Sequence, residues 1–214
     1  MTIRHHLSEQ LLTGYAAGQL PEAFNLIVAT HVSLCDECRA RLASLEAVGG
    51  SLIEKIDEIE MGEAALEAAL ARIDGLPQAT QRAPLKAAGI LPAPLADYVG
   101  GDLSMVRWRR IGGGVKQAIL PAGPGATARL LYIPAGTAVP DHGHRGMELT
   151  LVLQGAFADA NDRFGPGDIE IADENMEHTP VAMAGEACIC LAVTDAPLRF
   201  RGMIPRLAQP LFRI

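Results

Sequence analysis

The sequence has few aromatic residues and no long hydrophobic run. Aromatic side chains make up 4% of its 214 residues, although hydrophobic residues make up 49%. Aliphatic side chains must therefore fill the core. No apolar run approaches the roughly 18–20 residues that a membrane-spanning helix needs, and the chain starts without an apolar leader or a small-residue cleavage site. We therefore expect a cytoplasmic protein with no membrane segment.

The net charge of −7 lies entirely in the first part of the chain. Residues 1–76 contain five basic and twelve acidic side chains, whereas the remainder contains 13 of each. An acidic surface argues against direct binding of nucleic acid, because its phosphates are also negative. It suits a protein partner with a basic surface, since complementary charge steers association. An ordinary solvated surface with no partner explains the charge equally well.

Residues 1–76 have the pattern of a small helical bundle. Apolar spacing and capping residues predict four helices, at about 8–18, 21–31, 35–48 and 63–73. Gly49-Gly50 should stop or kink the third helix. The fourth has an apolar face of Leu66, Leu70 and Ile73, which we expect to contact a partner. A domain this small usually needs a metal, disulfides or a partner to be stable.

Residues 77–97 are expected to form a linker, because prolines alternate with alanine and glycine there. A long ordered loop packed on one domain is the alternative. From residue 98 to 214, short apolar runs alternate with Gly, Pro and Asp, which predicts a small all-β barrel or sandwich. The expected strands include Ala128–Ile133, Glu148–Leu153, Ile169–Ala172 and Cys188–Val193.

His31, Cys35 and Cys38 form a His-x3-Cys-x2-Cys pattern. Separations of four and three residues place them on one side of a helix, or on two helices that meet at a tight turn. Zinc prefers four such ligands in a tetrahedron, and His5 or His6 can supply the fourth from upstream. The alternative is an ordinary cytosolic cysteine pair beside an incidental histidine.

This pattern resembles the zinc-containing anti-sigma factors. The resemblance implies a four-helix module that holds zinc through an upstream histidine and the His-x3-Cys-x2-Cys motif. The matching positions are His6, His31, Cys35 and Cys38. It also implies that the module binds an extracytoplasmic-function (ECF, group IV) sigma factor and blocks its access to RNA polymerase. The zinc would be structural, so removal of Cys35 or Cys38 should unfold the module and free the partner.

A second ligand pattern lies in the β region. It matches the first cupin motif at every defined position: Gly136-x5-His142-x-His144-x3-Glu148-x6-Gly155. His142 and His144 face the same side of a strand, because they are two residues apart. Glu148 comes from the next strand, and His178 follows a later hairpin. Three imidazoles and one carboxylate suit zinc, iron, manganese or nickel, although a cupin without a metal is the alternative.

The second cupin motif departs from its usual form. The chain has Asp173 where proline is usual, Asn175 for glycine and Ala182 for asparagine. Asparagine tolerates a left-handed backbone, so the turn can still form. Further along, Cys188 and Cys190 share one face of a strand and are most simply interpreted as buried apolar side chains. Oxidation near the cupin metal is the alternative role.

The two patterns together resemble the ChrR family of bacterial anti-sigma factors over nearly the whole chain. That family responds to singlet oxygen and organic peroxides. The resemblance implies that residues 1–76 bind one ECF sigma factor in a 1:1 complex and that the cupin, residues 98–214, is needed for release. The main alternative is a metal-dependent cupin dioxygenase or isomerase with an accessory zinc module. A metal-storage or structural protein would explain neither the charge distribution nor the two ligand sets.

Overall fold

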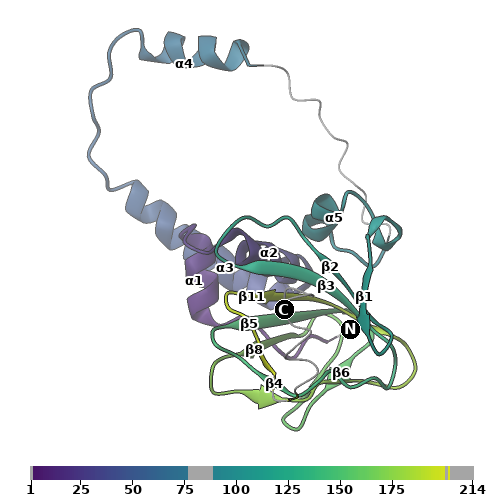
Figure 1. The fold of residues 1–214 in the computed structure, drawn as a ribbon. Coiled ribbons are helices and arrows are strands. Elements are labelled where there is room, and N and C mark those ends of the chain that lie inside the picture. The colour runs from purple at the N-terminus through teal and green to yellow at the C-terminus, as the bar shows by residue number, and fades with distance from the viewer. Residues whose placement is uncertain (1, 77–88, 201, 203–214) are drawn as a thin grey trace.

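The computed structural model describes residues 2–76, 89–200 and 202, and it shows helices followed by a β domain, in the predicted order (Figure 1). The helices are α1 (Glu9–Ala16), α2 (Glu22–Leu34), α3 (Asp36–Ile53), α4 (Ala65–Asp74), α5 (Ala93–Val99) and the 3-10 helix η1 (Leu103–Met105). Ser8 caps α1, as predicted, by accepting a hydrogen bond from the backbone N–H of Leu11. None of the helices in these described ranges is long and apolar enough to cross a membrane.

The β domain consists of antiparallel strands in three sheets. Its strands are β1 (Arg109–Gly112), β2 (Val115–Ile119), β3 (Thr127–Ile133), β4 (His142–Gly143), β5 (Glu148–Gln154), β6 (Phe157–Ala158), β7 (Arg163–Phe164), β8 (Ile169–Ala172), β9 (Glu177–His178), β10 (Val181–Ala182), β11 (Cys188–Thr194) and β12 (Arg199–Phe200). The largest sheet has the order β1-β2-β3-β11-β5-β8, and the two smaller sheets have the orders β10-β6-β7 and β12-β4-β9. The four expected strands correspond to β3, β5, β8 and β11.

The two faces of the largest sheet differ because side chains alternate along each strand. On β5, Leu149 and Leu151 belong to a core that the helices share, whereas Glu148 and Thr150 line a cavity on the other face. The rest of the cavity lining comes from other strands of the largest sheet, from the smaller sheets and from the loops between them. The alternation therefore separates an outer face that contacts the helices from an inner face that lines the cavity.

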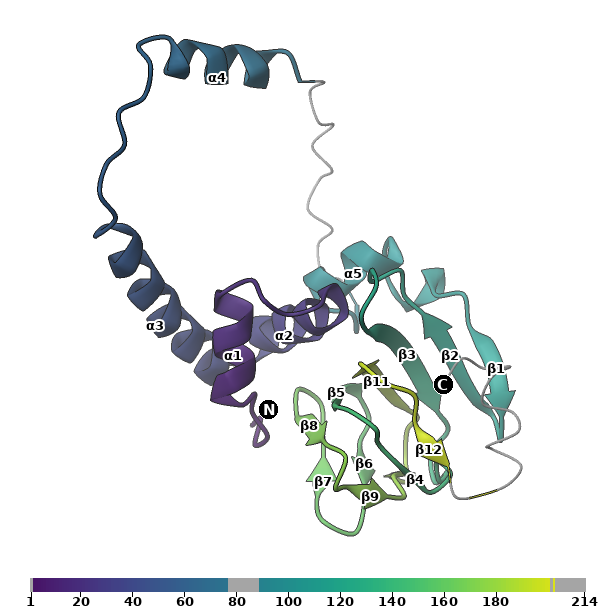
Figure 2. The same ribbon diagram turned by 60° about the vertical axis from the view of Figure 1, so that its left-hand side comes forward.

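Helix α2 packs on the outer face of the largest sheet, against β3, β5 and β11 (Figures 1 and 2). Its consecutive residues Leu26, Ile27 and Val28 are all buried, and they share one hydrophobic core with Leu151 and Leu191 of the sheet. A helix buried on several sides is expected to be apolar on several sides. The helical part is therefore stabilised by the β domain as well as by its own contacts.

Helix α3 differs from the prediction, because it continues through Gly49 and Gly50 to Ile53. Neither glycine has the left-handed backbone that ends a helix, and each costs only about 1 kcal/mol relative to alanine within a helix. Helix α4 follows after residues 54–64 and stands away from the rest of the molecule (Figure 2). Its apolar side chains are in solvent, with none buried.

The last part of the expected linker also differs from the prediction, because residues 93–97 form part of the helix α5. Pro94 lies in the first turn, where a proline is tolerated because no backbone N–H is needed. Leu91 and Leu95 are buried, and α5 packs on α2. The expected boundary at residue 98 thus falls inside a helix of the shared core. The earlier residues of the linker, 77–88, lie outside the described part.

Candidate metal centres

Four side chains that can bind a metal meet where the segment before α1 approaches the junction of α2 and α3. We call them the Cys/His group; they are His6, His31, Cys35 and Cys38, and their ligand atoms all lie within 4.8 Å of one another. Cys35 and Cys38 are free cysteines. The fold thus brings His6 of the N-terminal segment together with His31, Cys35 and Cys38, whereas His5 is not part of the group.

The spacing of the ligand atoms suits a small tetrahedral ion. The Sγ of Cys38 lies 3.3 Å from Nε2 of His31 and 3.7 Å from Nδ1 of His6, and that Nδ1 is 3.3 Å from Sγ of Cys35. Zinc bonds of about 2.3 Å to sulfur and about 2.0 Å to nitrogen, at tetrahedral angles, imply ligand separations of roughly 3.3–3.8 Å. The donor set and its geometry therefore match a closed zinc site.

The protein environment favours the neutral forms of two members of this group, Cys38 and His31. Burial raises the pKa of the Cys38 thiol to about 11. Burial, followed by the nearby His6, lowers the pKa of His31 to about 4. The remaining nitrogen of His6, Nε2, lies 3.3 Å from Oε2 of Glu37, which turns Nδ1 toward the cysteines. Metal binding would replace thiol protons, so the affinity of the group for a metal would rise with pH.

Three histidines of the β domain form a second cluster, which we call the histidine group: His142, His144 and His178. His142 on β4 pairs in register with His178 on β9. Among the described residues, the Nε2 of His178 and both ring nitrogens of His144 are buried without a hydrogen-bond partner. The Nδ1 of His142 is held by the Pro140 carbonyl at 2.8 Å. Buried nitrogens left free in this way match a divalent metal.

Glu148 lies at the edge of the histidine group, outside its closest set of ligand atoms. Its Oε2 is 3.5 Å from Nδ1 of His144, and Thr150 donates a hydrogen bond to its Oε1 at 3.2 Å. Burial alone would raise the pKa of Glu148, but His144, His142 and Arg129 hold it below its ordinary value. An ionised carboxylate is therefore available beside the three imidazoles.

Two acidic residues that the sequence analysis missed lie against His178. Oδ2 of Asp159 and Oε1 of Glu170 are each 3.2 Å from its Nδ1. They fix the ring so that Nε2 is left for a metal, as carboxylates do behind many metal-binding histidines. Glu170 could have been found, because it interrupts the apolar strand β8 at a position that faces inward.

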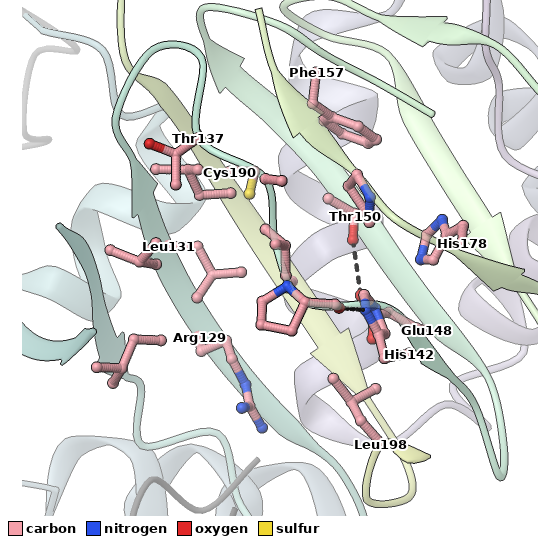
Figure 3. Close-up of a pocket in the computed structure, with 18 of the residues that line it drawn as sticks. Arg129, Leu131, Thr137, His142, Glu148, Thr150, Phe157, His178, Cys190 and Leu198 are labelled. Atoms are coloured by element: carbon pink, nitrogen blue, oxygen red, sulfur yellow. Dashed lines mark hydrogen bonds between the residues drawn. The ribbon is translucent and has the colours of Figure 1, made fainter. Parts of the chain in front are cut away.

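A cavity of about 370 Å³ opens beside the histidine group (Figure 3). Its walls are mostly apolar, and the charged or histidine side chains that line it are Arg129, His142, Glu148, Glu170 and His178. Cys190 lines the cavity and Cys188 is buried next to it, so the predicted burial of both is confirmed. The hydrogen bond to Cys188, together with burial, raises the pKa of Cys190 well above its ordinary value. The Cys190 thiol is therefore protonated at neutral pH and is a weak nucleophile.

The turn between β8 and β9 forms despite the altered second cupin motif. Asp173 accepts a hydrogen bond from the backbone N–H of Asn175 at 2.9 Å. Its carbonyl also accepts one from Met176 at 3.1 Å. An aspartate turn thus replaces the usual proline and glycine and still delivers His178 to the cavity.

Comparisons with known proteins cover the whole chain. Residues 98–197 match the family model of the ChrR Cupin-like domain, which confirms the cupin prediction. The anti-sigma-E factor ChrR of Cereibacter sphaeroides is 64% identical over 215 residues, which is all of both chains. A ChrR chain from the crystal structure of Rhodobacter sphaeroides SigE in complex with the anti-sigma ChrR is 62% identical, with a TM-score of 0.79 over 90% of this chain and 99% of that one. An RmlC-like cupin from Ralstonia eutropha is 21% identical, with a TM-score of 0.43 over 48% of this chain and 71% of that one. The chain therefore belongs to the ChrR family of anti-sigma factors.

Proposed function

We propose that this protein sequesters an ECF-type sigma factor in the cytoplasm, in a 1:1 complex, and so inhibits transcription. The observation that carries the proposal is the 64% identity, over both full lengths, to an anti-sigma-E factor. The similar ChrR chain was crystallised with a sigma factor. The chain is accordingly a regulator and not an enzyme.

An exposed surface suited to such a partner runs from the end of α3 to α4. Its large apolar side chains are more than half exposed; they are Val48, Leu52, Ile53, Ile56, Ile59, Met61, Leu66, Leu70, Ile73 and Leu76. Acidic residues alternate with them, among them Glu54, Glu58 and Glu67. Large apolar side chains exposed in such number along one segment indicate a binding site. The acidic side chains suit a partner with basic surfaces, as proteins that bind DNA have.

We propose zinc for the Cys/His group, with a structural role. The site would connect the segment before α1, the end of α2 and the start of α3, because one or two of its ligands come from each. For the histidine group we propose zinc or another divalent ion, bound by His142, His144 and His178 with Glu148 as the fourth ligand. That centre would receive the oxidative signal, singlet oxygen or an organic peroxide, that leads to release of the partner.

Purification of the complex tests the proposal. We expect the full-length chain, co-expressed with an ECF sigma factor, to co-purify with it at 1:1 and to carry two metal ions. His178→Ala should retain the complex, since the residue is remote from the apolar surface, but lose one metal and the response to an organic hydroperoxide. Substitution is preferable to deletion of residues 98–214, because deletion would expose the buried face of α2.

Two results would overturn this account. One is the absence of any complex between the full-length chain and ECF sigma factors of the same cell. The other is substrate-dependent turnover by the Fe(II)-loaded chain, which would favour the dioxygenase or isomerase alternative. If the His178→Ala protein still released the sigma factor normally on treatment with the hydroperoxide, the anti-sigma function would stand. Only the sensing role of the histidine group would be removed.

A further inference from the structure

The turn between β7 and β8 holds the beginning of the chain. Oδ1 of Asp168 accepts hydrogen bonds from the backbone N–H groups of Arg4, at 2.7 Å, and His5, at 3.0 Å. Its Oδ2 accepts one from the N–H of Gly165 at 2.8 Å, within the turn. The Asp168 residue is 3% exposed. One buried carboxylate thus joins two segments that are 164 residues apart in the sequence.

Further contacts fix the same N-terminal segment. The carbonyl of His5 accepts a backbone hydrogen bond from Ile169 at 3.3 Å, so the segment pairs with the start of β8. The Nε2 of the His5 ring lies 3.0 Å from Oδ2 of Asp162, and the ring packs on Phe164 with centroids 4.4 Å apart. The next residue is His6, a member of the Cys/His group. Contacts with the β domain therefore fix the position of the backbone next to His6, one of the proposed zinc ligands.

The same part of the β domain contacts the histidine group. Residues 159–170, which we call the bridging segment, have Asp159 at one end and Glu170 at the other, and both carboxylates lie 3.2 Å from Nδ1 of His178. Asp159 also accepts a hydrogen bond from the backbone N–H of Asp162 at 2.9 Å. The bridging segment is thus attached to His178 at both ends and to the N-terminal segment in between.

A second member of the Cys/His group also faces the bridging segment. The ring of His31 is fully buried. Burial and His6 lower its pKa, while the Gly167 carbonyl and the Asp168 carboxylate act in the opposite direction. The carbonyl is thus near the ring, although Nδ1 of His31 has no hydrogen bond of ordinary geometry with a described residue. The turn of the bridging segment therefore lies close to two of the four proposed zinc ligands.

We infer that Asp168 is a positioning residue that couples the two proposed metal centres through the bridging segment. This inference rests on the proposed metal sites, and it adds a connection that neither site implies by itself. A change at His178 displaces Asp159 and Glu170, the bridging segment moves with them, and Asp168 transmits the movement to the residues just before His6. The zinc ligand then shifts relative to Cys35 and Cys38.

The chemistry of Asp168 makes the connection behave as a switch. Two of its three N–H donors belong to the N-terminal segment, so a partial displacement of that segment would break these hydrogen bonds before water could reach the carboxylate. A buried carboxylate is costly unless hydrogen-bonded. Intermediate positions are therefore disfavoured, and the segment is either attached or fully released. The α2–sheet contact connects the same two parts, but it is apolar and includes neither His178 nor His6.

A double-mutant cycle in the full-length chain tests the coupling. Co(II) is loaded in place of zinc, and its thiolate absorption band reports the Cys/His group alone, since the histidine group has no thiolate. The rate at which a chelator removes this band is measured for the unaltered chain, His178→Ala, Asp168→Ala and the double variant. We expect His178→Ala to change the rate about tenfold when Asp168 is present, and less than about twofold in the Asp168→Ala background.

A matched control and a structural measurement accompany the cycle. Asp102→Ala removes an exposed aspartate that caps its own turn through the Leu103 N–H, and the tenfold effect of His178→Ala should persist in that background. Hydrogen exchange at the amides of Arg4 and His5 should accelerate in Asp168→Ala. If Asp168→Ala does not fold, Asp168→Asn keeps one acceptor for these amides and should give an intermediate coupling.

The outcomes separate the inference from the proposed function. An equal effect of His178→Ala in both backgrounds would show that coupling does not pass through Asp168. No effect of His178→Ala in the unaltered chain would overturn the coupling altogether. Absence of a thiolate band in the unaltered chain would instead remove the proposed zinc site itself.

Discussion

Replacement of Cys38 by serine should unfold α1 and α3 while leaving α2 and the β domain folded. Cys38 is fully buried, with its Sγ between the rings of His31 and His6. Cys38→Ser preserves the size of the side chain but removes a thiolate, and a neutral hydroxyl does not replace that ligand in a structural zinc site. The metal would then be lost.

The expected size of the effect follows from how little else holds these two helices. Structural zinc contributes about 10–16 kcal/mol in small zinc domains. Helix α1 buries Leu11 and Leu12, and the only buried leucine of α3 is Leu42. Each buried leucine contributes about 1.5–3 kcal/mol, whereas ordering each residue costs about 1–2 kcal/mol. Without the metal, α1 and α3 have no net stability, but α2 remains packed on the sheet.

Circular dichroism and limited proteolysis measure this outcome. The helical signal should fall by the eight residues of α1 and the eighteen of α3, and trypsin should cleave at Arg39 and Arg41. Cys188→Ser is the matched control, since Cys188 is equally buried and is not a proposed ligand. Retention of helix content, trypsin resistance and partner affinity by Cys38→Ser would refute a structural role for the zinc.

Two further predictions concern the shared core and the metal-free protein. Leu191→Ala should destabilise the chain by about 2–5 kcal/mol, because Leu191 is fully buried in the core that the sheet shares with α2; Val181→Ala, at a site 38% exposed, is the urea-unfolding control and should change stability far less. In chelator-treated protein, where α1 and α3 have no net stability, the pKa of His31 in the folded arrangement, about 4, lies below its ordinary 6.5, so refolding around it requires a neutral imidazole. Acidification from pH 6.5 toward 4 should therefore oppose refolding of these helices by about 3 kcal/mol in total, and zinc added back should restore the helical signal at pH 7 but not at pH 4.5. Equal restoration at both pH values would contradict burial of a neutral imidazole.

Local sequence patterns predicted four of the helices, four of the strands and the clustering of Cys and His residues at two places in the chain. Helical spacing, the Ser8 cap and the alternation in β5 and β11 are properties of short windows, and they appear in the structure. The packing of α2 on the sheet was not predicted, because it depends on surfaces far apart in the sequence. The consecutive buried residues Leu26, Ile27 and Val28 were the available signal that α2 is covered on more than one side.

The choice between His5 and His6 shows where sequence spacing stops being informative. The two residues are adjacent in the sequence, so their separations from His31 differ by one position only. Sequence spacing therefore left the fourth ligand open. In the structure, Asp162 and Asp168 bind His5, and His6 is thereby turned toward the cysteines. Contacts between residues more than 150 positions apart made the distinction, and no local pattern records them.

The separation of α4 from α3 has a consequence for how tightly a partner is held. A flexible chain the length of residues 54–64 spans roughly 20 Å, so a partner that has bound α3 meets α4 at a local concentration of about a millimolar. Two weak contacts then act as one strong one, with a combined affinity that exceeds either alone by about 100- to 10,000-fold. The converse also holds. A small distortion of α3 that weakens one contact removes the whole increase in affinity that the linked pair of contacts provides. On the proposed function, a movement at the proposed zinc ligands that reaches α3 would thus weaken both contacts together.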